Sequence, residues 1–385
     1  MSTDALRIIL IYGGQSGEHE ISCRSAVYVE ENLLEAGYHV TPVYVSPQGG
    51  WHRQERVSAD IAKQFERPCF IAPLPSSEKE IVSLLHLENR AATDELNSSG
   101  GARYGLISQK GLEPFDFVFP IIHGTTGEDG KLQGLLDFYK IPYAGAGVLG
   151  SAVAMDKYYA RTLFEAAGLP QTPWMMVEKA SWASEQKDII KEVSEKLTYP
   201  VFVKPCNMGS SVGVKKADSP GDLPDAVQDA FAYDHKILIE TGVDAREVEI
   251  SITGNYPDYQ LSEIGEIAVK SNFYNYEAKY AGTNDAELII PAQISDSQKN
   301  EILRMAKKGF QAIGGDGFAR IDFFLDRKSS QIYLNEINTL PGFTSISMFP
   351  ILWHHAGVEG PALLKRIVEL GLMRASRENS LRHAR

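Results

Sequence analysis

The chain has 385 residues, with 43% hydrophobic residues, 23% charged residues and a net charge of −12. This length predicts two or three domains, because single hydrophobic cores rarely grow beyond about 250–300 residues. The acidic balance disfavours nonspecific binding to nucleic acids and to anionic membrane surfaces. The three cysteines are widely spaced and form no CxxC pair, and no apolar run approaches the length that spans a bilayer. We therefore expect a cytoplasmic protein with neither a nucleic-acid nor a membrane partner.

The N-terminal residues predict a strand, a glycine loop, a helix and a second strand. The strands cover 7–12 and 40–45, the loop 13–20 and the helix 22–36. This order is typical of a parallel βαβ unit. Glu18 lies between the loop and the helix, where it could pair with the helix dipole or bind the ammonium group of a substrate.

A second glycine loop follows the next clear strand. Residues 115–122 predict the strand, His123 to Gly130 form the loop, and a helix begins at Lys131. Glycine loops at the C-terminal ends of strands mark the edge of an α/β sheet where ligands bind. His123 could therefore contact a carboxylate or a reacting amine, or it could be a buried core histidine.

Two lysines in the middle of the chain are candidates for phosphate binding. Lys204 ends a strand at 199–204, directly before the glycine-rich loop 207–213, and Lys157 lies in a predicted helix at 151–167. Backbone N–H groups of such a loop and a lysine at a strand end can hold phosphate oxygens. The loop matches neither a Walker motif nor a GxGxxG fingerprint, and a structural turn and a solvent-facing lysine are the alternatives.

Carboxylates and aromatic residues follow in the next part of the chain. Glu240 ends a strand at 236–240, and Glu247 precedes another at 248–253. Such carboxylates could accept hydrogen bonds from a base amino group or from ribose hydroxyls, or they could be surface residues. Segment 270–285 is polar and aromatic with little periodicity, which favours a lid over a reaction site or an ordinary surface loop.

Two β-prone runs near the C-terminus carry polar groups two residues apart. Arg320 and Asp322 lie in the first run, and Glu336 and Asn338 lie in the second. Positions i and i+2 of a strand point to the same face. These oxygens and the guanidinium predict a site for Mg²⁺ that also holds phosphate, whereas lone strand carboxylates are more often solvated.

Whether the two runs share their polar face depends on the hairpin loop between them. If residues 326–330 form a five-residue loop, Asp322 and Glu336 lie on one face, one pair apart diagonally. A loop one residue shorter would put them on opposite faces. The amide of Gly342 and the hydroxyls that follow could hold an oxyanion and a substrate carboxylate. The last helix is expected near 360–375, with Arg374 at the start of a solvated basic tail.

Together these motifs resemble the D-alanine–D-alanine ligases of the ATP-grasp superfamily, over nearly the whole chain except residues 51–110. The motifs that carry the resemblance are Gly13-Gly14-x-Ser16-x-Glu18-His19-Glu20, His123-Gly-x-x-Gly-Glu-Asp-Gly130, Met155-Asp-Lys157, Lys204-Pro, Gly209-Ser-Ser-Val-Gly213, Tyr276-x-Ala-Lys279-Tyr280, Arg320-Ile-Asp322 and Asn335-Glu-x-Asn338-Thr-x-Pro-Gly342.

The resemblance implies an α/β fold that is α+β in its ATP-grasp portion, with ATP between two sheets. It implies an N-terminal parallel α/β substrate-binding domain at 1–145. A central ATP-grasp domain with the phosphate loop would cover 146–243, and a C-terminal domain with the metal site and the lid would cover 244–385. Segments 272–282 and 207–213 are the lid candidates.

The resemblance also implies ligands and the residues that bind them. For ATP these are Lys157 and Lys204 at the phosphates, Gly209, Ser210 and Ser211 in the loop, Glu240 at the adenine, Glu247 at the ribose, and Lys279 at the transferred phosphoryl group. Two Mg²⁺ (or Mn²⁺) ions would be held by Asp322, Glu336 and Asn338.

The implied substrate residues surround two D-alanine molecules. Glu18 would bind the first ammonium group and form a triad with Ser210 and Tyr280, and His123 would contact the same substrate. Arg320 and the Gly342 amide would stabilise developing negative charge. The second D-alanine would meet Ser345, Ser347 and Met348.

The implied reaction joins the two D-alanines through an acyl phosphate, for peptidoglycan precursor synthesis, in an enzyme expected to be a homodimer. Tyr280 favours the dipeptide-forming type, since relatives that use D-lactate typically have histidine in that loop. Two alternatives remain open. One is another ATP-grasp ligase, such as a biotin carboxylase or a glutathione-synthetase-like enzyme, and the other is a nucleotide-binding regulatory protein without catalysis.

Overall fold

The computed structural model describes residues 6–57, 70–73, 104–108, 111–269 and 286–381. The lid candidate at 272–282 therefore lies outside the described residues. The chain divides into two compact units. Unit 1 comprises Met1–Val148, Gly342–Pro350 and Val358–Arg385, and unit 2 comprises Leu149–Pro341 and Ile351–Gly357.

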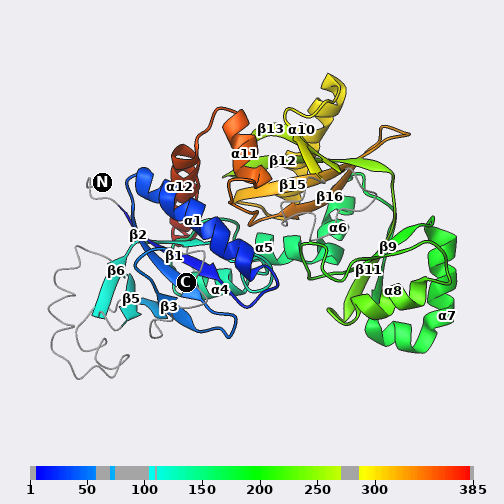
Figure 1. Ribbon diagram of the computed structural model, residues 1–385, viewed down its shortest axis with the longest axis horizontal. Coiled ribbons are helices and arrows are strands. Elements are labelled where there is room, and N and C mark those ends of the chain that lie inside the picture. The colour runs from blue at the N-terminus through cyan, green and yellow to red at the C-terminus, as the bar shows by residue number, and fades with distance from the viewer. Residues whose placement is uncertain (1–5, 58–69, 74–103, 109–110, 270–285, 382–385) are drawn as a thin grey trace. The chain divides into compact units, whose positions relative to one another are not determined.

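Unit 1 is built on a four-stranded sheet with the order β3-β2-β1-β7, of which β1, β2 and β3 are labelled in Figure 1. Strand β1 (Arg7–Gly13) pairs in parallel with β2 (His39–Val45) and with β7 (Phe117–Pro120), and β3 (Trp51–Arg53) pairs antiparallel with β2. Helix α1 (His19–Glu35) connects β1 to β2, so the predicted parallel βαβ unit is confirmed. Residues 8–12 are all buried, as expected for a parallel strand covered on both faces.

Further elements of unit 1 come from both ends of the chain. Strands β4 (Phe70–Pro73), β5 (Tyr104–Ser108) and β6 (Gly111–Phe115) form a three-stranded antiparallel sheet. The predicted strand at 115–122 is shorter: Phe115 ends β6, Asp116 lies between the two strands in an ion pair with Arg7, and β7 ends at Pro120. Helix α4 (Lys131–Phe138) begins after the second glycine loop, as predicted.

The C-terminal helices correct one expectation. Helix α11 is Met348–His355 and α12 is Gly360–Asn379. Arg374 on α12 is not solvated, since only 2% of its surface is exposed. Its guanidinium donates to the Gly145 carbonyl at 2.5 Å and to the Tyr143 carbonyl at 3.2 Å, and it lies over the Tyr143 ring. Hydrogen bonds to backbone carbonyls and the aromatic contact make its burial possible.

The first sheet of unit 2 has the order β10-β9-β11-β8, and every neighbouring pair is antiparallel. Its strands are β8 (Trp174–Glu178), β9 (Val201–Pro205), β10 (Lys215–Ala217) and β11 (Lys236–Thr241). Helices α7 (Lys179–Lys196) and α8 (Leu223–Ala230) lie beside this sheet (Figure 1). Their buried side chains belong to the same apolar cluster as one face of the sheet. Lys204 and Glu240 alternate with the residues of that cluster, so both point to the opposite face.

The second sheet of unit 2 has five antiparallel strands in the order β14-β13-β12-β15-β16. They are β12 (Ala245–Asn255), β13 (Asp258–Val269), β14 (Ala286–Ile289), β15 (Gly317–Asp326) and β16 (Ile332–Asn338). Helices α6 (Lys157–Ala166) and α10 (Asp296–Ala312) pack on its apolar face. The expected α/β class with antiparallel ATP-grasp-like sheets is confirmed. Within the described residues, none of the helices has the length and hydropathy to cross a membrane.

The single helix predicted at 151–167 is two helices. Helix α5 (Val148–Met155) ends before Asp156, and α6 begins directly after it. Asp156 has an extended backbone, and its carboxylate accepts from the N–H groups of Tyr158 and Tyr159. An aspartate in this position caps the second helix. The break puts Lys157 at the first position of a helix rather than in the middle of one.

Candidate active site

The hairpin β15–β16 sets the register of the predicted metal residues. Asp326 pairs with Gln331, so the loop is 327–330 and is one residue shorter than expected. That change alone would put the two carboxylates on opposite faces. However, Phe323 pairs with Leu334 whereas Asp322 pairs with Glu336, because a β-bulge at Asn335 inserts one residue into β16. The bulge restores the shared face, and the expected diagonal arrangement is wrong: the two residues are direct partners.

The polar face of this sheet carries a row of three carboxylates. Asp322 pairs with Glu249 on β12 and with Glu336 on β16, and directly paired residues lie on the same face. Arg320 is two residues from Asp322 on the same face. Its guanidinium donates to both Asp322 oxygens at 2.8 and 2.7 Å, and its Nε lies 3.0 Å from a Glu249 oxygen. One cation therefore holds two of the three carboxylates.

These charges explain the protonation state of Arg320. Burial by itself would lower the pKa of the guanidinium, but the attraction of Asp322 and Glu249 outweighs it, so the pKa lies well above its ordinary value. Three carboxylates and one guanidinium give this group of residues a net charge of −2. A cross-strand row of like charges is unfavourable unless a cation compensates it.

The donor set fits a divalent cation, although the carboxylates do not converge on one point. Among the described residues, no three His, Cys, Asp or Glu side chains form a metal-binding group. Asp322 is engaged by Arg320, and the Asn338 side-chain oxygen accepts from the Leu340 N–H at 3.0 Å. Carboxylate and amide oxygens are the ligands that Mg²⁺ prefers. A cation bound here would share the Asp322 carboxylate with Arg320, because each carboxylate oxygen has a second lone pair.

The first sheet of unit 2 carries a buried ionic cluster around Glu240. One Glu240 oxygen contacts Lys204. The other contacts Arg161 and accepts from the Thr172 hydroxyl at 3.1 Å. Arg161 also donates to the Thr172 hydroxyl at 3.0 Å. Burial would raise the pKa of Glu240, but the two cations lower it to about 2, so the carboxylate is a charged acceptor at neutral pH.

Lys157 contacts the glycine-rich loop from the start of α6. Its backbone N–H donates to the Cys206 carbonyl at 3.0 Å, and its ammonium group donates to the Met208 carbonyl at 2.5 Å. Asp234 accepts from the backbone and side chain of Asn207 at 2.8 and 3.0 Å. The base of the loop is therefore held by the start of α6 and by Asp234, which precedes β11, and Lys157 is half-buried rather than solvent-facing.

The loop itself has an irregular backbone. Ser210 and Ser211 have φ values of 49° and 60°, and Gly213 has 71°. A Cβ at Gly213 would lie 2.6 Å from the Tyr233 ring and 2.8 Å from Pro205, so this position requires glycine. In a turn, successive backbone N–H groups can face an anion. Gly209 accepts at its carbonyl from Val212 and closes the turn.

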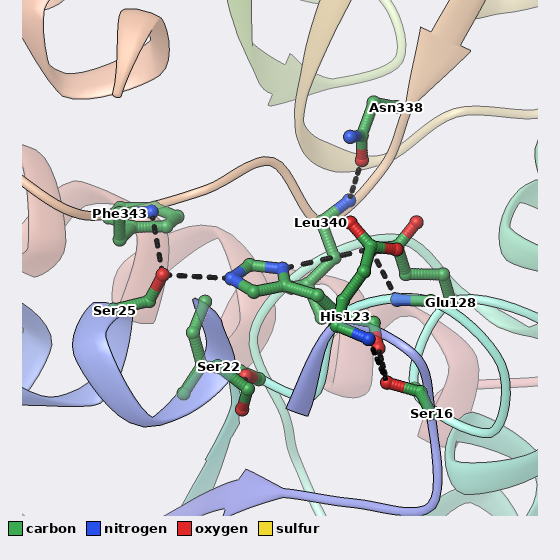
Figure 2. Close-up of polar contacts among 12 residues, drawn as sticks. Ser16, Ser22, Ser25, His123, Glu128, Asn338, Leu340 and Phe343 are labelled. Carbon is green, nitrogen blue, oxygen red and sulfur yellow. Dashed lines mark hydrogen bonds and ion pairs between the residues drawn. The ribbon is translucent and has the colours of Figure 1, made fainter. Parts of the chain in front are cut away.

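In unit 1, His123 joins a buried polar network (Figure 2). Its Nε2 lies 2.8 Å from the Ser25 hydroxyl, and Ser25 also accepts from the Phe343 N–H at 3.1 Å. Its Nδ1 lies 3.7 Å from a Glu128 oxygen. Burial raises the pKa of Glu128, despite the opposing effect of His123. His123 is therefore buried and hydrogen-bonded, as the core alternative predicts, and its contact with a substrate stays a prediction.

Glu18 lies beside the same loop. A Cβ at Gly124 would be 2.8 Å from a Glu18 oxygen, and Glu18 also contributes to the raised pKa of Glu128. Ser16 links the two glycine loops, because its hydroxyl donates to the His123 carbonyl at 2.7 Å (Figure 2). Glu18 makes no side-chain hydrogen bond that would cap α1. Its carboxylate instead faces the loop that carries His123.

The segment after β16 forms a compact turn in unit 1. Ser347 accepts from the Thr344 N–H at 3.0 Å and lies 2.7 Å from the Thr344 hydroxyl. A Cβ at Gly342 would be 2.8 Å from the Ser347 oxygen, so the absence of a side chain keeps that hydroxyl close. Met348 begins α11, and Ser345 is exposed.

The structure brings the predicted residues together in three groups. Unit 2 holds the Lys204–Glu240 cluster with Lys157 and its loop, and the polar face with Arg320, Asp322, Glu336 and Asn338. Glu247 lies on that same face, two residues before Glu249. Unit 1 holds Glu18, His123, Gly342, Ser345, Ser347 and Met348. Lys279 and Tyr280 lie outside the described residues.

Sequence reasoning missed four residues of these clusters: Arg161, Thr172, Glu249 and Glu128. Three of them had a signal in the sequence. Glu128 belongs to the glycine-loop motif from His123 to Gly130, although no role was assigned to it. Arg161 is four residues after Lys157, which is the same face of a helix, and Glu249 is two residues after Glu247, which is the same face of a strand. Thr172 lies in a connection between elements, so no periodicity points to it.

Comparison with known proteins gives consistent results. The family models described as D-ala D-ala ligase N-terminus and C-terminus match residues 7–146 and 163–369. A D-alanine–D-alanine ligase of Bacillus velezensis is 39% identical over 97% of this chain and 99% of its own length. The structure of a D-Ala:D-Ser ligase from Enterococcus faecalis has a TM-score of 0.77 and 28% identity, and it covers 96% of this chain and 100% of that one. D-alanyl-alanine synthetase A from Vibrio cholerae has a TM-score of 0.77 and 30% identity, with 97% and 100% coverage.

Proposed function

Because the chain belongs to the D-alanine–D-alanine ligase family, we propose that it joins two D-alanine molecules in a reaction driven by ATP, which releases ADP and phosphate. The product is a precursor for peptidoglycan. The observation that carries the proposal is the polar face of the second sheet, where a bulge aligns Asp322 with Glu336 beside Arg320. Phosphoryl transfer relies on positioned charged groups and metal ions that offset the charge of the phosphates, and this face offers carboxylates for metal ions together with an arginine.

The first chemical task is to activate a carboxylate. We propose that ATP lies with its adenine near Glu240, its ribose near Glu247 and its phosphates near Lys157, Lys204 and the loop that contains Gly209, Ser210 and Ser211. The pairing of Lys204 with Glu240 supports this assignment. A phosphate would compete with Glu240 for the lysine, and Arg161 would continue to neutralise Glu240. Glu240 would then accept a hydrogen bond from the adenine amino group.

Asp322, Glu336 and Asn338 would hold the two Mg²⁺ or Mn²⁺ ions that we propose. These ions, when bound, offset the repulsion between the phosphates and the attacking carboxylate. Lys279 is proposed to contact the transferred phosphoryl group. The product of this step would be an acyl phosphate, which water hydrolyses unless the site closes.

The second task is to join the amine. Glu18 and His123 are proposed to bind the first D-alanine, and Ser345, Ser347 and the Met348 amide to bind the carboxylate of the second. When the amine attacks the acyl phosphate, negative charge develops on the carbonyl oxygen. Donors aimed at that oxygen stabilise the transition state, and we assign this role to Arg320 and the Gly342 amide. Ser210, Tyr280 and Glu18 would form the triad that closes the site.

We also propose the organisation in which this chemistry takes place. Domain boundaries after residues 145 and 243 would separate a substrate-binding domain from the two halves of the ATP-binding portion. The enzyme would act as a homodimer in the cytoplasm. Size-exclusion chromatography with light scattering tests the dimer, and a monomer mass at working concentration would contradict it.

Phosphate release tests the function directly. The protein is incubated with ATP and Mg²⁺, and D-alanine, L-alanine, D-lactate or D-serine is added in turn. We expect D-alanine to stimulate release and L-alanine to have no effect, with the dipeptide as the product in mass spectrometry. Similarity to a D-Ala:D-Ser ligase makes D-serine an informative second substrate. Phosphate release that ignores D-alanine would refute the proposal.

A further inference from the structure

Glu249 is a buried carboxylate to which neither the motifs nor the proposed mechanism gives a task. It is 5% exposed and pairs directly with Asp322 across the sheet. Two carboxylates opposite each other repel, and burial makes the repulsion more costly. An apolar residue would be the ordinary choice in a central strand. The buried charge of Glu249 therefore needs a compensating interaction, which the ion pair with Arg320 supplies.

Arg320 lies between Glu249 and Asp322. Its Nε is 3.0 Å from a Glu249 oxygen, and its donors reach both Asp322 oxygens at 2.8 and 2.7 Å. Asp322 is also a proposed ligand of the divalent cation. A cation on Asp322 would weaken the ion pair between Asp322 and Arg320, because two positive charges would then share one carboxylate. Among the described residues, Glu249 is the other carboxylate in ion-pair contact with Arg320.

We propose that Glu249 is a positioning residue, which holds the Arg320 guanidinium in place when Asp322 also binds the cation. The inference rests on the proposed function, in which Arg320 stabilises the developing oxyanion. An arginine with a single carboxylate partner would change its direction when that carboxylate binds the cation, or its guanidinium would move into solvent. An arginine with a second, buried partner on the same face keeps its direction. Glu249 thus keeps the Arg320 guanidinium in position while Asp322 binds the metal ion.

Glu249→Gln tests this role, because it keeps the size of the side chain and removes its charge. Glu266→Gln is the matched control. Glu266 is also 5% exposed and lies in the same sheet, where it accepts from Arg246 at 2.8 and 2.5 Å. It pairs with Val248, so it lies on the face opposite Glu249. Both variants lose a buried ion pair, but only Glu249→Gln loses it on the face that carries the proposed site.

The expected result is a selective loss of turnover. At saturating ATP, Mg²⁺ and D-alanine, kcat of Glu249→Gln should fall roughly 100-fold, the effect of a misplaced catalytic group, while the KM for ATP stays within about threefold. Glu266→Gln should keep kcat within about twofold. A Glu249→Gln variant with the kcat of the control would overturn the inference, whereas a wild-type protein without D-alanine-dependent turnover would refute the proposed function instead.

Two further measurements separate positioning from other roles. Calorimetry of ADP binding with Mg²⁺ should give Glu249→Gln a dissociation constant within about threefold of wild type; a loss above tenfold would make Glu249 a metal ligand and overturn the inference. In an Arg320→Met background, Glu249→Gln should lower kcat by less than about twofold, since its effect acts through Arg320. An equal loss in both backgrounds would show that Glu249 acts independently of Arg320.

Discussion

Replacement of Arg161 by methionine should leave the buried carboxylate of Glu240 with one cation fewer. Arg161 and Glu240 are each 3% exposed at their side chains, so solvent cannot replace the lost partner. Methionine keeps most of the length of the arginine stem and contributes no charge. The variant therefore isolates the electrostatic role of the guanidinium at Glu240 and Thr172.

The size of the effect follows from the pKa of Glu240. Burial alone would raise it, yet Arg161 and Lys204 lower it from 4.5 to about 2. Each pKa unit corresponds to about 1.4 kcal/mol, so the environment favours the charged form by about 3 kcal/mol. Removal of one partner of a buried pair costs about 3–5 kcal/mol. We expect the free energy of unfolding of Arg161→Met to fall by about 3 kcal/mol at pH 7.

The lowered pKa of Glu240 also determines how the loss of stability changes with pH. The pKa of Glu240 is lower in the folded protein than in the unfolded chain, so its contribution to stability is present above about pH 4.5 and is lost as the pH falls toward 2. Without Arg161 the pKa rises, and the carboxyl group becomes neutral at a higher pH. The difference between the variant and wild type should therefore be largest at pH 7 and smaller at pH 4.5.

Urea unfolding at pH 7 and pH 4.5 measures both quantities. Arg304→Met is the control, because Arg304 forms an exposed pair with Glu301 one turn away on α10, and such pairs contribute about 0.5 kcal/mol or less. Arg161→Met with Glu240→Gln should recover part of the stability, since no buried charge is left unpaired. A cost for Arg161→Met within about 1 kcal/mol of the control would refute the reasoning.

Three other predictions address the proposed site. Glu336→Ala should abolish turnover and leave the circular dichroism spectrum unchanged; near-normal turnover would show that the metal assignment is wrong. Gly213→Ala should raise the KM for ATP at least tenfold, because its Cβ would meet Tyr233 and Pro205 at 2.6 and 2.8 Å; an unchanged KM would exclude a tight loop. Cys206 should resist iodoacetamide at pH 8, since burial raises the pKa of its thiol to about 12; rapid labelling would contradict that value.

Local patterns were sufficient where the physics is local. The alternation of apolar and polar residues in 317–325 predicts that Arg320 and Asp322 share a face, because the side-chain period of a strand is fixed. The continuous apolar run 8–12 predicts β1 for a different reason, since a parallel strand covered on both faces buries successive residues. The helix at 151–167 shows the limit. The prediction of one continuous helix overlooked Asp156, whose carboxylate caps a second helix by accepting from the Tyr158 and Tyr159 N–H groups.

The sequence alone determined which chemical groups this protein has, and tertiary structure decided which of them meet. The residues in the strands and glycine loops indicate carboxylates, lysines and an arginine suited to ATP and a divalent cation. Only the folded chain shows that a bulge at Asn335 compensates for a short hairpin loop, that Arg161 reaches Glu240 from 79 residues away, and that Glu249 shares Arg320 with Asp322. Cross-strand register and long-range ion pairs arise from packing over the whole unit, and no short window of sequence encodes them.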